Sequence, residues 1–164
     1  MKTLSIELAI ERLESRGVTV DDITDLVFDL QTPYVENLTK ATCKYNVVRV
    51  LSKREVQNAL LTGIELDQLA EEGKLQQPLQ DIVASDEGLY GIDEIIALAI
   101  VNVYGSIGLT NFGYVDKIKP GIIAKLNDHA DGKCHTFLDD IVGAIAAAAS
   151  SRLAHSEEGA EVPD

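Results

Sequence analysis

The chain has 164 residues, enough for one domain with a sizeable core, and 46% of them are hydrophobic. Its 14 Lys and Arg residues face 27 Asp and Glu, which gives a formal net charge of −13. Nucleic-acid binding needs clustered Lys and Arg, so this balance argues against it. For the same reason, unaided docking on an anionic membrane surface is disfavoured.

Nothing at the start of the chain resembles a signal peptide, because Glu7 follows the opening residues closely. The longest apolar runs cover residues 95–101 and 141–149 and are too short to cross a bilayer. The two cysteines, Cys43 and Cys134, are far apart and form no metal-binding pair. We therefore expect no transmembrane segment and a cytoplasmic protein with reduced thiols.

Apolar residues at helical spacing predict three helices in the first part of the chain. They cover residues 3–16, 20–31 and a long segment from Thr39 to about Thr62. Gly63 is expected to end the third helix, because glycine commonly follows a helix C-terminus. A short helix is then expected over 64–72.

The second half predicts short helices separated by turns. A short helix begins at Pro78, and a long apolar one covers 92–104. The glycine-rich stretch 105–114 is expected to be partly helical at best. A further helix follows Pro120 and runs to Asn127, and the last runs from Thr136 to about Leu153.

Thr136 and Asp139 are spaced like the two ends of a capping box. No stretch alternates with period two, so we expect an all-α protein. It would form a single compact domain over residues 1–155, followed by an acidic, disordered tail over 156–164.

Two of the predicted helices are almost entirely apolar, and each begins with a pair of acids. Asp93-Glu94 opens one, and Asp139-Asp140 lies in the first turn of the other. A helix that is apolar on all sides is normally buried. Carboxylates at the mouth of a core are costly unless they are paired or bound to a metal ion. Because Mg²⁺ binds carboxylate oxygens and bridges to phosphate, the doubled pattern indicates a magnesium site.

The acids also have a purely structural explanation. Negative charge in the first turn complements the helix dipole, and this alone accounts for acids at two helix starts. Because an acidic pair begins both of the two most apolar helices, the metal site remains a hypothesis beside this explanation. Lys117 and Lys119, just after Asp116, could steady a phosphate, or they could belong to an ordinary solvated loop.

Three segments resemble, in this order, the acidic motifs of the phosphatidylglycerophosphatase A (PgpA) family. They are Gly91-Ile92-Asp93-Glu94-Ile95-Ile96-Ala97, Tyr114-Val115-Asp116-Lys117-Ile118-Lys119-Pro120 and Thr136-Phe137-Leu138-Asp139-Asp140-Ile141-Val142-Gly143-Ala144. These motifs lie within about residues 88–150. Nearly the whole chain resembles the soluble YutG-like and low-temperature-requirement-C-like branch. The membrane enzymes carry a glycine-rich phosphate motif ahead of their Asp-Glu pair, whereas residues 105–113 here follow it.

The resemblance implies an all-α fold with a central apolar helix surrounded by others. It also implies Mg²⁺-dependent removal of the terminal phosphate from phosphatidylglycerophosphate. Carried over by motif, the metal ligands would be Asp93, Glu94, Asp116, Asp139 and Asp140. The catalytic acid, acting as base or nucleophile, would be Asp139, Asp140 or Asp93. Lys119, with Lys117 beside it, would contact the substrate phosphate.

Two other functions stay open at this point. One is an all-α, Mg²⁺-dependent nucleotide pyrophosphatase of the MazG kind, although its E-x-x-E pairing is not found. The other is a helical regulatory or scaffold protein that has the same fold and no activity. The expected partner is a phospholipid headgroup or another small phosphate ester, which would place the protein in the cytoplasm or peripherally on a membrane. Many short apolar helices also suit self-association, but no heptad seam specifies it.

Overall fold

In the computed structural model, which describes residues 3–128 and 131–156, every regular element of those residues is a helix. The elements are α1 (Ile6–Ser15), α2 (Val20–Gln31), α3 (Lys40–Leu51), α4 (Arg54–Glu71), α5 (Leu79–Ala84), α6 (Ile92–Val101), the short 3₁₀ turn η1 (Asn102–Tyr104), α7 (Gly105–Ile118), α8 (Ile122–Asn127) and α9 (Leu138–Ala154). The all-α prediction is confirmed. Residues 157–164, where most of the predicted acidic tail falls, lie outside the described residues.

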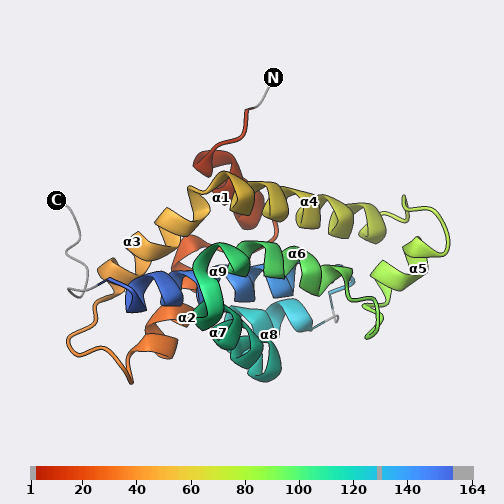
Figure 1. The fold of residues 1–164 in the computed structure, drawn as a ribbon. Helices are drawn as coiled ribbons and strands as arrows, with labels where there is room; N and C mark the ends of the chain where they lie inside the picture. Colours follow the sequence, from red (N-terminus) through yellow and green to blue (C-terminus); the bar gives the residue numbers. More distant parts are fainter. Residues whose placement is uncertain (1–2, 129–130, 157–164) are drawn as a thin grey trace.

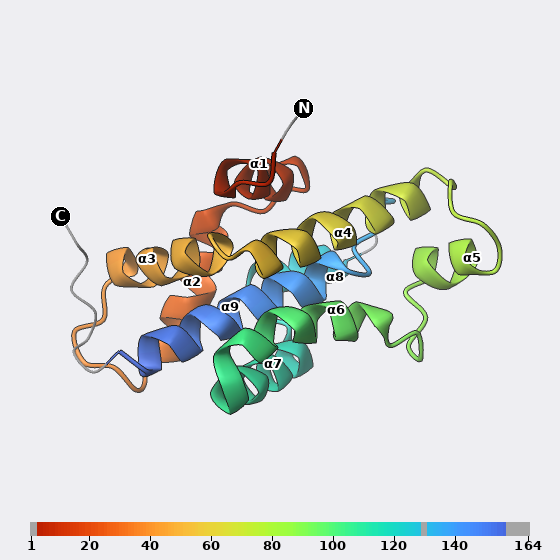
Figure 2. The ribbon, with the colours of Figure 1, turned by 45° about the horizontal axis from the view of Figure 1, so that its top comes forward.

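The central element is α9, which runs through the middle of the molecule (Figure 1). It contacts α2, α3, α4, α6, α7 and α8, and every residue from Leu138 to Ser151 is buried. Its many alanines leave room for neighbouring helices to approach closely. Figure 2 shows α9 between the α3–α4 side and the α6–α7 side. The expected central apolar helix is therefore confirmed.

The first three helices begin at the side-chain caps that their sequences provide. The hydroxyl of Ser5 accepts the Leu8 N–H, and that of Thr39 accepts the Thr42 N–H. Thr19 forms a complete capping box, because its own N–H also donates to the carboxylate of Asp22. Such caps satisfy backbone N–H groups that have no partner within the helix.

The prediction that Gly63 ends a helix is wrong. The break comes earlier, at Ser52 and Lys53, where the Gln57 side-chain amide donates to the Leu51 carbonyl at 2.9 Å. Gly63 lies inside α4 because it packs against α9. A Cβ at this position would come within 2.3 Å of Ile141 Cδ1. Here glycine serves a close contact between two helices.

The glycine-rich stretch after η1 is wrongly predicted to be only partly helical, since α7 is continuous from Gly105 to Ile118. Its buried residues Gly108, Phe112 and Val115 follow helical spacing. Phe112 and Val115 pack against Gly143 of α9, where a Cβ would lie within 3.7 Å of both side chains. Tertiary packing therefore compensates for the low helix propensity of glycine.

The expectation that the helix from Ile92 is buried on all sides is also wrong. Ala97, Ile100 and Val101 face the core, but Ile92 and Ile95 are exposed. The segment Ile92–Ile118 has 27 residues and a mean hydropathy of 1.7, so by length and composition alone it could cross a membrane. In its most apolar window, 28% is buried inside the molecule. This is weak evidence for a span, because core helices of globular proteins pass the same test.

Candidate functional site

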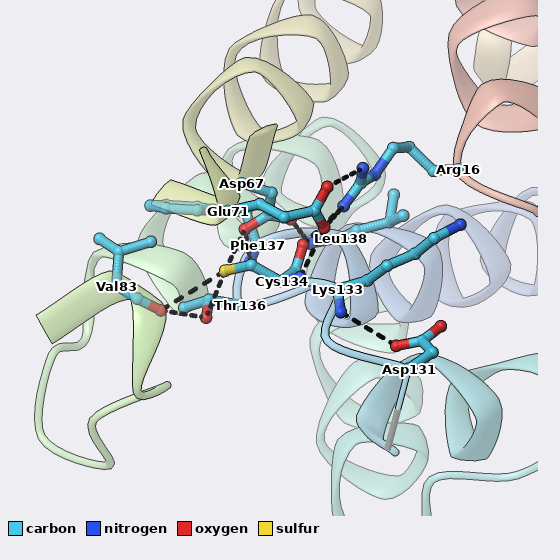
Figure 3. Close-up of polar contacts among 10 residues, drawn as sticks. All are labelled: Arg16, Asp67, Glu71, Val83, Asp131, Lys133, Cys134, Thr136, Phe137 and Leu138. Carbon is cyan, nitrogen blue, oxygen red and sulfur yellow. Dashed lines mark hydrogen bonds and ion pairs between the residues drawn. The ribbon is translucent and has the colours of Figure 1, made fainter. Parts of the chain in front are cut away.

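The first turn of α9 has no side-chain cap of its own. The predicted capping box at Thr136 is not formed, because the Thr136 hydroxyl instead donates to the Val83 carbonyl at 2.6 Å. The cap comes from α4, where both carboxylate oxygens of Asp67 accept backbone N–H groups, from Phe137 and Leu138, at 2.9 Å each. Figure 3 shows Asp67 above this turn.

Asp67 is fully buried, and burial raises its pKa to about 7, although the two N–H donors act in the opposite direction. Asp67 is not among the functional residues predicted from the sequence. The available signal was its place on the buried stripe of α4, one turn after Gly63 and Ile64. An acid among apolar residues at that spacing needs a polar partner, and here the partner is the start of another helix.

A second contact from α4 fixes the segment that leads into α9. Glu71 accepts the Cys134 N–H at 2.8 Å and pairs with Arg16 of the α1–α2 turn at 2.9 Å. Arg16 also donates to the Cys134 carbonyl at 2.8 Å, as Figure 3 shows. The backbone from Cys134 to Leu138 is thus held by Arg16, Asp67 and Glu71, which fixes where the next two residues lie.

Those two residues are Asp139 and Asp140, which are only 6% and 7% exposed. Asp139 Oδ1 accepts the Asp140 N–H at 2.8 Å. Lys119 at the end of α7 lies between α7 and α9, with Nζ 3.6 Å from Asp139 Oδ2 and 3.3 Å from Asp116 Oδ1. Lys119 has a left-handed backbone (φ 46°, ψ 58°) at the C-terminus of α7.

The surroundings of this pair oppose negative charge. Burial raises the pKa of Asp139, and Lys119 only partly offsets this effect. The pKa of Asp140 is raised by burial, by Asp139, by a hydrogen bond with Asp116 and by Asp93. Asp93 of α6 and Asp116 of α7 therefore converge on the acids of α9. Two carboxyl groups joined by a hydrogen bond must share a proton unless a cation replaces it.

The structure separates the members of two predicted pairs. Asp93 is partly buried and acts on Asp140, whereas Glu94 is exposed on α6. Lys119 is partly buried between Asp116 and Asp139, whereas Lys117 is exposed on α7. Asp93 and Glu94 are adjacent on a helix and point about 100° apart, so only one of them faces the acids of α9. Lys117 is within α7, whereas Lys119 follows its last residue with a left-handed backbone, so these two side chains also point in different directions.

The oxygen-rich set of Asp93, Asp116, Asp139 and Asp140 fits a hard cation such as Mg²⁺ in its chemistry. Within residues 3–128 and 131–156, no three Asp, Glu, His or Cys side chains are close enough to enclose an ion on their own. Mg²⁺ commonly keeps several waters and takes one or two carboxylates, so a partly hydrated ion suits this arrangement.

The sequence profile of phosphatidylglycerophosphatase A matches residues 19–155. The chain belongs to this family. The match covers α2 to α9 and includes all the acids that converge on the first turn of α9. The fold expected from the resemblance and the observed fold therefore agree.

Two relatives from Bacillus subtilis are similar to this PgpA-family chain. YutG, an uncharacterized protein, is 65% identical over 144 residues, covering 88% of this chain and 87% of that one. YpjQ, also uncharacterized, is 57% identical over 153 residues, covering 93% and 86%. A more distant relative, the uncharacterized protein MJ1330 of Methanocaldococcus jannaschii, is 33% identical over 115 residues, covering 70% and 84%.

Two solved structures share the fold closely. A protein of unknown function from Bacillus stearothermophilus has a TM-score of 0.92 and 65% identity, with 96% of this chain and 97% of that chain covered. The low temperature requirement C protein from Listeria monocytogenes has a TM-score of 0.91 and 62% identity, with 95% and 98% covered. These structures place the chain in the branch that its sequence resembles.

Proposed function

We propose that this protein is a Mg²⁺-dependent phosphomonoesterase that removes the terminal phosphate of phosphatidylglycerophosphate. One observation carries the proposal. Asp139 and Asp140 are buried at the start of the central helix, Asp93 and Asp116 act on them from two other helices, and Lys119 lies against them. Membership of the family supports a phosphate ester as the class of substrate.

Asp140 and Asp116, which share a hydrogen bond, are the two carboxylates that would hold the ion, and Asp93 acts on Asp140 from α6. A bound Mg²⁺ would neutralise charge on the phosphoryl oxygens. Lys119 is well placed to donate to a phosphate oxygen. Although burial alone would lower its pKa, Asp139 and Asp116 raise it, so Lys119 stays protonated.

Asp139 is the proposed general base. Burial raises its pKa, and a proton acceptor works best when its pKa lies near the working pH. Asp139 takes a proton from water as the water oxygen bonds to phosphorus. The ester P–O bond then breaks, and the proton passes to the leaving oxygen. The products are inorganic phosphate and the alcohol, phosphatidylglycerol.

The test is phosphate release by the purified protein, with and without Mg²⁺. The substrates are phosphatidylglycerophosphate in detergent micelles, a water-soluble phosphomonoester and a nucleoside triphosphate. Release from the lipid that needs both Mg²⁺ and Asp139 supports the proposal. Release of pyrophosphate from the triphosphate would instead support a nucleotide pyrophosphatase. If no substrate is turned over and Mg²⁺ does not change the melting temperature, a non-catalytic scaffold protein is the remaining explanation.

The two separated pairs supply matched variants for this assay. Asp93→Asn and Lys119→Gln remove side chains that face the acids of α9, and each is expected to lower kcat/KM by about 10²–10⁴. Glu94→Gln and Lys117→Gln make the same chemical changes at exposed neighbours, and a much smaller loss is expected. Equal losses within each pair would contradict the proposed geometry.

A further inference from the structure

The large apolar side chains that the described residues expose are concentrated in one part of the molecule. Of the ten such side chains, eight lie between Leu89 and Ile118, on α6, η1, α7 and the turn before them. We call this region the α6–α7 surface. It includes Ile92, Ile95, Val103, Ile107, Leu109 and Tyr114. Exposed apolar patches of this kind mark sites of interaction.

The middle of the α6–α7 surface is also free of charge. No Asp, Glu, Lys or Arg occurs from Ile95 to Val115, although such residues form 25% of the chain. Depletion of charged residues distinguishes the core of a protein–protein interface from the rest of a protein surface. Charged residues resume along the sequence at Asp93-Glu94 before this stretch and at Asp116-Lys117 after it.

A hollow extends the same surface onto α2. It has a volume of about 350 Å³ and lies between α2 and α7, with Leu26, Leu30, Tyr114 and Ile118 among its walls and the acid Asp29 at one place in them. The Tyr34 side chain beside it is 82% exposed. The α6–α7 surface thus combines projecting apolar side chains with an adjacent apolar hollow that can receive such side chains.

We propose that the α6–α7 surface, with the hollow beside α2, is the interface between two copies of this chain. Charge decides between a second copy and a lipid bilayer. The uncharged stretch from Ile95 to Val115 can meet its own copy without repulsion at the contact, although each chain carries a net charge of −13. A two-fold axis through the region would pair the surface with itself.

An anionic bilayer is a poor partner for the same surface. Residues 89–120 contain only two basic side chains, Lys117 and Lys119, and Lys119 is already held by Asp116 and Asp139. Stable docking on anionic lipid uses clusters of basic residues.

The first test is sedimentation velocity of the full chain over a range of protein concentrations. We expect a dimer for the unaltered protein. Ile95→Glu and Leu109→Glu place a charge in the contact and should weaken self-association at least about tenfold each. Leu79→Glu makes the same change at an exposed leucine of α5, outside the surface, and should leave the dimer intact. Circular dichroism and melting temperature would verify that each variant is folded.

Salt dependence and vesicle flotation together distinguish a second copy of the chain from a lipid bilayer as the partner. Screening reduces repulsion between two acidic chains, so added salt should strengthen the dimer. Flotation with vesicles of anionic phospholipid is measured in parallel. A monomer at every concentration, a dimer that both glutamate variants leave unchanged, or a monomer that floats with the vesicles through Ile95 and Leu109 would each overturn the proposal.

Cysteine cross-linking keeps the test valid if a glutamate variant fails to fold. Both native cysteines are buried, so a new surface thiol is the reactive one. Val103→Cys, Ile107→Cys and Tyr114→Cys sample the surface, and at least one should give a disulfide-linked dimer on mild oxidation. Leu79→Cys should not. Cross-linking from Leu79→Cys alone would contradict the interface. This inference does not depend on the proposed phosphatase activity.

Discussion

The carboxylate of Asp67 in α4 accepts the backbone N–H of Leu138, the first residue of α9, at 2.9 Å. The helix that holds Asp139 and Asp140 is therefore capped by a different helix. Because Asp67 also accepts the Phe137 N–H, both oxygens of its carboxylate are used, and the direction of the first turn of α9 is fixed. The place of the candidate metal ligands thus depends on a residue that would not touch the metal.

Replacing Asp67 by Asn should therefore destabilise the fold. An amide offers one oxygen, so one of the two buried N–H groups would lose its acceptor, at a cost of about 1–3 kcal/mol. Urea unfolding at pH 8 measures the loss, with Glu65→Gln on the exposed side of the same helix as control. An Asp67→Asn protein as stable as the control would show that this cap contributes little.

Replacing Asp140 by Asn should have the opposite effect on stability in the absence of metal. The side chain keeps its shape but can no longer ionise, so folding no longer requires a buried charge or the uptake of a proton at this position. We expect the variant to gain about 1 kcal/mol or more in chelator, while losing phosphatase activity and any stabilisation by Mg²⁺. Thermal unfolding with and without Mg²⁺ tests both parts. Lower stability of the metal-free variant would contradict the proposed cost of the charge.

The stability of the metal-free protein should fall as the pH rises from about 5 to 8. The pKa values of Asp67, Asp139 and Asp140 are raised in the fold, so at these pH values the folded state binds more protons than the unfolded state. Stability is then lost with rising pH, by at most about 1.4 kcal/mol per pH unit for each group.

Mg²⁺ should flatten this pH dependence, because the ion replaces the protons that the acids would otherwise bind. Urea unfolding across the pH range, in chelator and in Mg²⁺, measures both slopes. The Asp139→Asn/Asp140→Asn double variant serves as control and should show a shallower slope without metal. If stability in chelator instead rose with pH, this result would contradict raised pKa values for Asp139 and Asp140 in the fold.

Two glycines within helices should respond oppositely to alanine. Gly63→Ala would place a Cβ 2.3 Å from Ile141 Cδ1 and 3.1 Å from Phe137 Cβ, which should cost about 1–3 kcal/mol. Gly113→Ala in α7 meets nothing within 4 Å and should gain up to about 1 kcal/mol from helix propensity. Unfolding of both variants at low protein concentration gives the comparison. A stabilised Gly63→Ala protein would mean that α4 and α9 are less tightly packed than the structure indicates.

Several features could be read from the sequence because they depend on local patterns. The apolar spacing of α1 and α2 is local, and so is the helix that begins near Pro120. The apolar run after Asp140 predicts the buried central helix, because a segment without a polar face has to be covered by its neighbours. The acids at the starts of two such helices pointed to the candidate site for the same reason.

Other features were decided only by the tertiary structure, because they depend on contacts between distant segments. The sequence predicts a helix end at Gly63, and only the contacts with Phe137 and Ile141 explain why this glycine lies inside α4. Asp67 has no local signal that links it to residues 70 positions later. The choice of Asp93 over Glu94 also depends on which side of α6 faces α9. Sequence determined which residue types could form the site, and packing determined which of them face one another.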